Sequence, residues 1–513
     1  MYTYNQLYFQ YKKLYPRYLK KLILILNSVH GNNFSQKYWE PIIGIYLRRF
    51  LLIYLFVKNN LENRFLFENL DIKKVNFHKS YREFSNSIDF FSSKRIKFFK
   101  IPKNQNFKRY EFNNLSLIAR TMNYFKILIP NILIKLNIIK IFFSESYFRK
   151  NLKRYFCIKS SFSFFQFPKF ELENFKIIKK EIFINRLSIL NEQQSKIKND
   201  DLLKNILLFM PINYIENYKV IFREIEKINL SEGIYTDGTY VSFDYIKFFI
   251  AKLKINKKKI FIGQHSLRNG LEDYDIFFDY SKSICSHFLT WGWKDKNELI
   301  KNFSSLRIFS SIKKYKEIKK INNKNLKISF ILCGFSEIGE SFYDNFIENK
   351  KAELARIDLI KKIYNFKEIK ISLKPRPGSF IIDDKKKFYK KFEILKYKSR
   401  MYDIFGKFDI LIYERLSLGI VESIYMNQPV IFFYPKQLYK MKNSNYNDLI
   451  LKLKKAKIFF DDFKKVKKII SSQKNIDKWW LNKENIKCRE KILKEYAKSF
   501  KFEDLKKLIK FSH

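Results

Sequence analysis

Residues 409–433, DILIYERLSLGIVESIYMNQPVIFF, place two strand-like runs on either side of a helical pattern. The outer runs, DILIY and PVIFF, are rich in β-branched and aromatic residues and have the length of strands. Between them, apolar residues recur at the spacing of one helix face. Ser417 is suited to cap that helix, and Pro429 ends it, because proline cannot continue a helix. The segment therefore predicts a strand–helix–strand unit with parallel strands.

Two polar residues of this unit fall where α/β proteins bind ligands. We expect Ser417 at the carboxyl end of the first strand, beside a helix N-terminus that is suited to phosphate. Glu422 lies one helical turn later, within reach of a pair of ribose hydroxyls. Both residues are therefore candidate nucleotide-binding residues.

A basic loop precedes this unit in the sequence, KISLKPRPGS at 370–379. Lys374 and Arg376 stand just past a predicted strand, and the two prolines between and after them stiffen the loop. Lysine acts on a phosphate as a point charge, whereas arginine can bind it with two parallel hydrogen bonds. The alternative is an ordinary proline turn with two solvated cations.

Another loop, GFSEIGES at 334–341, follows the strand that opens the second α/β block. Its glycines and hydroxyls, Gly334 and Ser336 first among them, would let a phosphate approach the backbone. The loop matches neither the dinucleotide-binding fingerprint nor a Walker motif, so it is a weak signal by itself.

His265 is the candidate for proton transfer. It lies in GQHSLRNG (263–270), after an apolar strand, and its imidazole suits either proton transfer or phosphate contact near neutral pH. Asp279, later in the same block, could orient the ring or serve as the base in its place. The alternative for His265 is a loop histidine that is bonded to the backbone.

Candidate acceptor-binding residues occur near the N-terminus, in HGNNFSQKYWEPIIG at 30–44. His30, Tyr38 and Trp39 carry rings, and tyrosine and tryptophan stack well on sugar faces. The same rings are equally good core residues, and core packing is the favoured alternative for Trp39.

Composition limits the function classes. The 513-residue chain has a formal charge of +52 and is 46% hydrophobic, which excludes wholesale disorder. Its lysines are spread over the whole length and form no recognisable nucleic-acid module, so we expect no nucleic-acid partner. A basic surface is nevertheless attracted to anionic membrane leaflets.

The sequence predicts neither a metal site nor a cofactor. It contains no H-E-x-x-H motif and no cluster of cysteine and histidine. We therefore expect a metal-independent reaction in which Lys374 and Arg376 stabilise the leaving group. The N-terminus does not read as a signal peptide, and charged residues or proline interrupt the apolar runs. These features predict a cytoplasmic protein that can rest peripherally on the inner membrane.

The arrangement of the blocks predicts the domains. We expect an N-terminal acceptor-side domain over 1–300, helical over 1–200 and α/β over 200–293. A C-terminal nucleotide-sugar-binding domain should cover 301–480, with terminal helices over 481–513. The predicted fold class is α/β, a GT-B-like pair of facing Rossmann-type domains with a helical N-terminal region and C-terminal helices.

Several segments taken in order resemble one known family. HGNNFSQKYWEPIIG, FIGQHS with Gly270, FLTWGW, LKPRPGS and SLGIVESIYMNQPVIFF are similar to bacterial transferases of surface-carbohydrate biosynthesis. That family typically shows Q-H-G-G, whereas this chain has Gln264-His265-Ser266-Leu267. The wider group resembles GT-B enzymes that use CMP-activated ulosonic acids.

In those enzymes a K-x-[HR]-P loop holds the nucleotide phosphate and an S…E helix holds the ribose. The resemblance implies these roles for Lys374, Arg376, Ser417 and Glu422, and it adds Ser423 to the nucleotide site. It also implies a nucleotide sugar, with a CMP-sugar favoured, and a glycan or glycolipid acceptor.

Our first hypothesis is therefore a glycosyltransferase that transfers a sugar, such as an ulosonic acid, to a cell-surface polysaccharide or glycolipid. The altered Gln264–Leu267 loop favours an alternative, a non-catalytic glycosyltransferase-like scaffold of envelope assembly. A third hypothesis, nucleic-acid binding by charge, predicts tight and salt-sensitive binding to duplex DNA.

Overall fold

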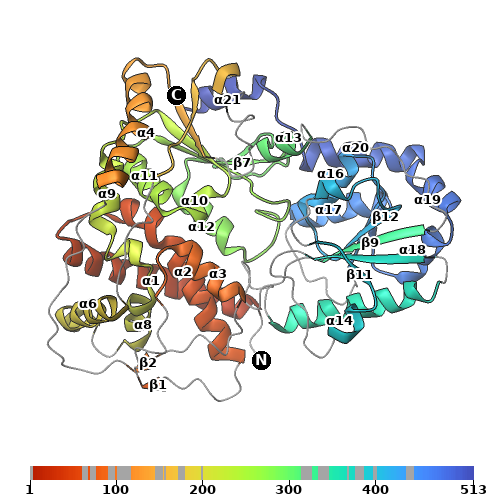
Figure 1. Ribbon diagram of the computed structural model, residues 1–513, viewed down its shortest axis with the longest axis horizontal. Coiled ribbons are helices and arrows are strands. Elements are labelled where there is room, and N and C mark those ends of the chain that lie inside the picture. The colour runs from red at the N-terminus through yellow and green to blue at the C-terminus, as the bar shows by residue number, and fades with distance from the viewer. Residues whose placement is uncertain are drawn as a thin grey trace. The chain divides into compact units, whose positions relative to one another are not determined.

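The computed structural model is an α/β protein with two six-stranded sheets (Figure 1). It describes residues 4–60, 68–69, 77–90, 99–100, 117–144, 154, 157–170, 179–197, 200–312, 326–332, 346–366, 369–375, 386–396, 401–434 and 444–512. The chain divides into two compact units. The first comprises Met1–Gly263, Ile276–Phe288 and Leu505–His513, and the second comprises Gln264–Asp275 and Leu289–Asp504.

The first sheet has the strand order β4-β3-β5-β6-β7-β8. Its strands are β3 (Ile141–Ser144), β4 (Phe164–Gln166), β5 (Gly233–Thr236), β6 (Lys259–Gly263), β7 (His287–Thr290) and β8 (Ile300–Asn302). The β3–β4, β3–β5 and β5–β6 pairs are parallel. The strands that follow β3 lie on both of its sides, so the strand order reverses between β3 and β5.

Two of these strands lie in the region that the sequence predicts to be mostly helical. β3 and β4 precede residue 200 and are four and three residues long. All four residues of β3 are buried, so its sequence shows no alternation of apolar and polar residues. A short, continuously apolar run of this kind cannot be distinguished from part of a buried helix by periodicity.

Helix α2 (Gln36–Asn60) is the central helix of the first unit. It contacts α1 (Tyr4–His30), α11 (Asp244–Ile255) and α12 (Ile276–Ile284). Neighbours on several sides bury almost all of α2 from Tyr38 to Phe56, including Arg48 and Arg49. No helix in the described part of the chain has the length and apolar character needed to cross a membrane.

The remaining helices of the first unit are shorter or more peripheral. They are α3 (Tyr81–Phe90), α4 (Leu117–Lys135), α6 (Lys179–Glu192), α7 (Gln194–Ile197), α8 (Asp201–Phe209), α9 (Tyr218–Glu226), α10 (Thr239–Ser242) and, from Leu505 on, α21 (Glu503–Ser512). Two short segments, β1 (Glu68–Asn69) and β2 (Phe99–Lys100), pair in parallel.

The second sheet has the strand order β11-β10-β9-β12-β13-β14, and all of its pairs are parallel. Its strands are β9 (Leu326–Ile331), β10 (Ile369–Lys374), β11 (Glu393–Ile394), β12 (Ile410–Tyr413), β13 (Val430–Phe433) and β14 (Phe459–Phe460). Counted from β9, this is the 3-2-1-4-5-6 order of Rossmann folds. The predicted Rossmann-type topology of this region is therefore confirmed.

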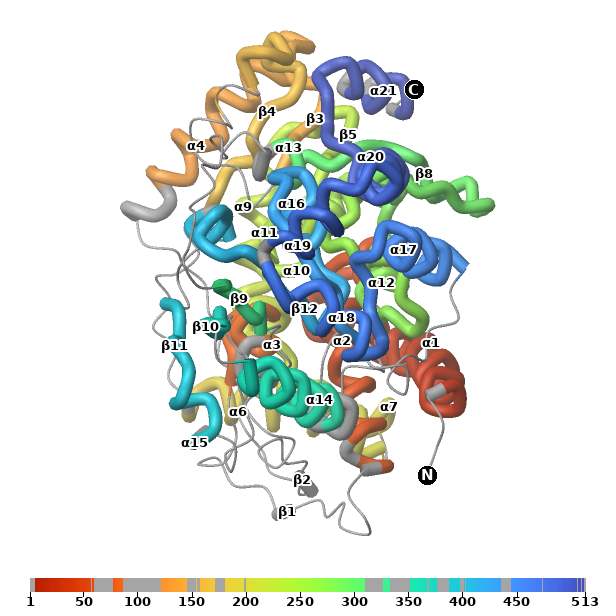
Figure 2. The backbone as a smooth tube through the Cα atoms, turned by 90° about the vertical axis from the view of Figure 1, so that its right-hand side faces the viewer, coloured from red at the N-terminus to blue at the C-terminus, as the bar shows by residue number. Residues whose placement is uncertain are grey.

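Helices cover both faces of the second sheet. Figures 1 and 2 both show α14 (Phe346–Tyr364) on one side and α16 (Leu418–Tyr425) and α17 (Ser444–Lys455) on the other. The other helices of the second unit are α13 (Leu306–Ile312), α15 (Lys386–Tyr389), α18 (Phe463–Ile470), α19 (Gln473–Trp480) and α20 (Lys483–Tyr496). The predicted strand–helix–strand unit is confirmed as β12, α16 and β13, with parallel strands.

The two compact units are interleaved along the chain, and the domain boundary at residue 300 stays a prediction. The loop 264–275 clusters with the second unit, residues 276–288 return to the first, and the chain from Leu289 to Asp504 belongs to the second. One reason is local: the main-chain N–H of Gln264 donates to the carbonyl of Leu289, at 2.8 Å. This bond joins two segments of the second unit that are separated in the sequence.

Gly419 gives a test of the packing that positions α16. A Cβ atom at Gly419 would lie 2.4 Å from the hydroxyl of Tyr413, which is fully buried. We expect Gly419→Ala to lower the free energy of unfolding by about 1–3 kcal/mol, because the ring must move within a packed core. Helix propensity alone predicts a gain of about 1 kcal/mol.

Urea unfolding measures the sign of this change. The loss in the free energy of unfolding should be smaller in a Tyr413→Leu background. There the side chain that would clash with the new Cβ atom at position 419 is smaller. A stabilised Gly419→Ala variant would contradict the packing described for α16.

Candidate functional site

The carboxyl ends of three neighbouring strands form one edge of the second sheet. Ile331, the last residue of β9, is paired with Lys374 of β10 on one side and with Tyr413 of β12 on the other. Since neighbouring strands are about 4.8 Å apart, the main chains of Lys374 and Tyr413 are about 10 Å apart. The strand order reverses between β9 and β12, and open α/β sheets bind ligands at such points.

Ser417 occupies the N-cap position of α16 at this edge. Its backbone is extended, with φ −145° and ψ 161°, and its side chain makes no capping hydrogen bond. The residue is only 9% exposed, and its Oγ atom has no hydrogen-bond partner within the residues that the structure describes. An unpaired buried hydroxyl costs about 1–3 kcal/mol. A ligand oxygen bonded to Ser417 would remove that cost, next to the partial positive charge of a helix N-terminus.

The other polar residues of α16 differ in how they are used. Glu422 lies one turn after Ser417 and is 8% exposed. Ser423 is fully buried, and its hydroxyl donates to the carbonyl of Gly419 at 2.7 Å, within the same helix. The Ser423 hydroxyl is therefore occupied by its own helix, in contrast to that of Ser417.

Lys374 ends β10 at the same edge. It is 3% exposed, and its ammonium donates to the carbonyl of Pro375 at 3.0 Å. The ammonium group is therefore held next to the main chain at the end of its own strand. Arg376, Gly334 and Ser336, which the sequence also assigns to the nucleotide site, lie outside the described residues, and their roles stay predictions.

An ion pair with a buried arginine holds the connection from β12 to Ser417. Glu414 directly follows β12, and its two carboxylate oxygens lie 2.8 and 3.1 Å from Nη1 of Arg356, in α14. The same guanidinium donates to the hydroxyl of Tyr389 at 2.8 Å and lies 3.3 Å from Glu353. These partners compensate a buried charge that would be costly if it were unpaired.

This pair was not predictable from the sequence, because Arg356 and Glu414 are 58 residues apart. The sequence does contain a local signal for one partner of this arginine. Glu353 and Arg356, three residues apart on a helix, lie on one face of it and can act together.

Gln264 organises the loop that carries His265. The side chain is completely buried, and its Oε1 accepts hydrogen bonds from the main chain of Trp291 (2.9 Å) and from the indole of Trp293 (2.8 Å). Its Nε2 donates to the carbonyl of Ser266 at 2.9 Å. One amide therefore joins the loop after β6 to the FLTWGW segment, which explains why the two motifs occur together.

His265 lies on this loop in a half-buried position. Nη1 of Arg307 donates to the His265 carbonyl at 2.6 Å, so the main chain that carries the imidazole is fixed from a second direction. Leu267, which departs from the family's glycine, is buried. The main chain at His265 is therefore held in place, and the role of His265 in proton transfer stays a prediction.

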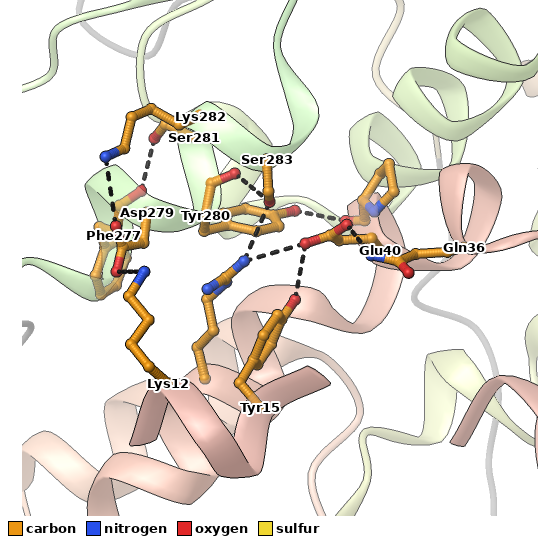
Figure 3. Close-up of polar contacts among 12 residues, drawn as sticks. Lys12, Tyr15, Gln36, Glu40, Phe277, Asp279, Tyr280, Ser281, Lys282 and Ser283 are labelled. Atoms are coloured by element: carbon orange, nitrogen blue, oxygen red, sulfur yellow. Dashed lines mark hydrogen bonds and ion pairs between the residues drawn. The ribbon is translucent and has the colours of Figure 1, made fainter. Parts of the chain in front are cut away.

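Asp279 belongs to the first unit, on α12 (Figure 3). It accepts a hydrogen bond from the hydroxyl of Tyr8 at 2.7 Å and lies 3.0 Å from the ammonium of Lys12 and 3.5 Å from that of Lys282. Burial by itself raises the pKa of the carboxyl, but Lys12 and the Tyr8 hydrogen bond outweigh it and hold the pKa below the ordinary value. A lowered pKa makes Asp279 a weaker base, and its three partners suit a structural role.

A second network of the first unit joins α1, α2 and α12 (Figure 3). Glu40 accepts hydrogen bonds from Tyr15 (3.0 Å), Gln36 (2.9 Å) and Arg48 (3.1 Å). Arg48 also donates to Ser283 of α12 at 3.2 Å. Both charges are buried and paired, so this network holds the three helices together.

Gly44 provides room for this network. A Cβ atom there would lie 3.0 Å from the hydroxyl of Tyr15 and 3.2 Å from the Cγ of Glu40. The Y-W-x-x-x-x-G spacing that contributes to the family resemblance thus has a packing reason.

The aromatic residues proposed to bind the acceptor form a cluster in the first unit. Tyr38 and Trp39 are 2% and 0% exposed, and the Trp39 indole donates to Asn27 at 2.8 Å. His30 stacks on Tyr218, with ring centroids 3.9 Å apart, and the Tyr218 hydroxyl donates to that of Tyr38. Neither Tyr38 nor Trp39 exposes a ring face to a sugar, so we assign both to the core, the alternative that the sequence left open.

Within the described ranges, no group of three or more histidine, cysteine, aspartate and glutamate residues could hold a metal ion. The candidate site therefore rests on Lys374, Ser417 and Glu422 in the second unit, with the Gln264–His265 loop as the candidate for proton transfer.

The pKa of Asp279 gives a pH-dependent prediction. Because the folded state lowers this pKa, the interactions of Asp279 stabilise the protein above the unfolded value of about 3.8 and are lost as the pH falls through the folded value. Asp279→Asn should therefore be less stable than the wild type at about pH 6, by about 1–3 kcal/mol. Urea unfolding of both proteins at several pH values should show the difference vanish in acid. A difference that is the same at neutral and acidic pH would contradict the ionised assignment.

Comparisons with known proteins agree with a transferase. A family model described as LIC12162 family transferase matches residues 3–511 of the chain. Comparison with curated proteins found no match.

Proposed function

We propose that this chain, which belongs to the LIC12162 family of transferases, is a glycosyltransferase that uses a nucleotide-sugar donor. The acceptor would be a cell-surface polysaccharide or a glycolipid. The observation that carries the proposal is the buried, unpaired hydroxyl of Ser417 at the N-terminus of α16, where the strand order reverses. Phosphate groups bind at such helix ends.

The donor would be held by residues at one edge of the second sheet. Its phosphate would accept a hydrogen bond from Ser417 and receive positive charge from Lys374, which the strand register brings near. The Glu422 carboxylate, one turn into α16, would accept hydrogen bonds from the two ribose hydroxyls. Arg376, Gly334 and Ser336 are proposed to complete the phosphate contacts, as the sequence predicts.

The transfer exchanges one carbon–oxygen bond for another. The bond between the anomeric carbon and the nucleotide phosphate breaks, and the phosphate keeps the electron pair. The acceptor hydroxyl forms the new bond and loses its proton, which His265 is proposed to take. Lys374 and Arg376 would stabilise the leaving phosphate without a metal. We therefore expect turnover to persist in excess EDTA.

The finer assignments follow from the resemblance. We propose a CMP-sugar donor, a GT-B-like arrangement of the two Rossmann-type regions, and a cytoplasmic location with reversible contact at the inner membrane. The net charge of +52 supports attraction to anionic lipid. The alternative is a non-catalytic scaffold, which is favoured by the leucine at position 267 in place of the family's glycine. It predicts a chain that binds a nucleotide sugar without cleaving the bond between sugar and phosphate.

Two serines of one segment provide a matched test. Ser417→Ala should weaken nucleotide binding at least tenfold, since a hydrogen bond to a charged group contributes about 1.5–3 kcal/mol. Ser423→Ala should leave binding unchanged, because its hydroxyl bonds to Gly419. Calorimetric titration with CMP, UDP and GDP measures both variants.

Stability provides a second readout for the same pair. Ser417→Ala removes an unpaired buried hydroxyl, so its melting temperature should stay level or rise while its affinity falls. Ser423→Ala should lose stability instead. Equal nucleotide affinity in the wild type and in Ser417→Ala would refute the proposed donor site.

A further inference from the structure

A basic pocket lies at the β14 edge of the second sheet, within the second unit. Its volume is about 600 Å³, in the range of small-molecule sites. The end of α17, strand β14 and helices α18 and α19 contribute most of its wall. It shares no residue with the proposed donor site. The lining residues are Lys454, Lys457, Phe459, Phe460, Asp461, Lys465, Lys468, Ile469, Asn475, Lys478, Trp479, Asn482 and Asn485.

The charge around this pocket is strongly one-sided. Five lysines line it, and Asp461 is the one acidic residue among its lining residues. Lys454 lies 3.6 Å from Asp461. The other four, Lys457, Lys465, Lys468 and Lys478, make no ion pair within the described part of the chain.

Lysines elsewhere in this unit show the contrast. Lys452, close by on α17, pairs with both Asp448 and Glu495. Unpaired ammonium groups around a concave surface reinforce one another and raise the local concentration of anions. The pocket therefore attracts an anion more strongly than an isolated surface lysine does.

The floor of the pocket is apolar and fixed. Phe459, Phe460, Ile469 and Trp479 each keep less than a tenth of their surface exposed. The Trp479 indole donates to the carbonyl of Lys457 at 2.9 Å, so the ring cannot turn freely. An apolar floor beneath a cationic rim suits a ligand with an apolar face and an anionic group.

We propose that this pocket is a second binding site, which takes a phosphate-bearing ligand of about the size of a sugar phosphate. Lysine binds phosphate as a mobile point charge, so several lysines can accommodate one or two phosphate groups without a fixed geometry. The phosphate can belong to a soluble compound or to a lipid headgroup. The proposal does not depend on the donor site, because the two share no residue.

Two arms of one experiment distinguish these sources. Calorimetric titration with inorganic pyrophosphate tests a soluble ligand, and co-sedimentation with phosphatidylcholine vesicles, with and without phosphatidic acid, tests a headgroup. The pocket variant is Lys465→Gln with Lys468→Gln. The control variant is Lys487→Gln with Lys494→Gln, on α20, which changes the net charge equally and lies outside the pocket. All four lysines are exposed, so both variants should fold.

The proposal predicts binding of at least one probe by the wild type, at least tenfold weaker in the pocket variant and within about twofold in the control. Loss in the pyrophosphate arm identifies a soluble ligand, and loss with phosphatidic acid vesicles alone identifies a headgroup. Equal weakening in both variants would show attraction to net charge and overturn the proposal. Absence of wild-type binding to either probe would overturn it as well. Nucleotide titration of the pocket variant should be normal, which separates this result from the donor site.

Discussion

Strand β9 pairs with a strand on each of its sides. This pairing determines the positions of the candidate ligand-binding residues. Backbone hydrogen bonds align Ile331 with both Lys374 and Tyr413, so the chain leaves β10 and β12 at the same level. A slip of one residue would turn every side chain of a strand to the other face. Lys374 and the start of α16 can approach one ligand because this register is fixed by buried strands.

The residues around Ser417 are held by packing and by hydrogen bonds, whereas the Ser417 side chain is not. Tyr413 packs beneath Gly419, and Glu414 is held by Arg356, so the connection from β12 to α16 is well defined. Within that framework the Ser417 hydroxyl is buried without a partner in the described residues. Proteins often keep such local costs at functional sites. The fixed neighbours mean that a ligand would meet the hydroxyl already in place.

Local patterns predicted much of the fold, and they named the residues of the candidate site, whose roles stay predictions. The helical spacing and Pro429 located β12, α16 and β13 closely, and the strand before Lys374 was correct. Partners distant in sequence were not predictable, because nothing local links Gln264 to Trp293 or Arg356 to Glu414. The rings proposed for the acceptor illustrate a further limit, since an aromatic residue looks the same in a core and at a sugar site.

We propose that a nucleotide binds at the carboxyl edge of the second sheet. Crystals of the chain grown with cytidine 5′-monophosphate or uridine 5′-diphosphate test it most directly. We expect a phosphate oxygen about 3 Å from Oγ of Ser417 and the ribose hydroxyls at the Glu422 carboxylate. A nucleotide bound elsewhere, for example where the strand order of the first sheet reverses between β3 and β5, with Ser417 still unpaired, would contradict it.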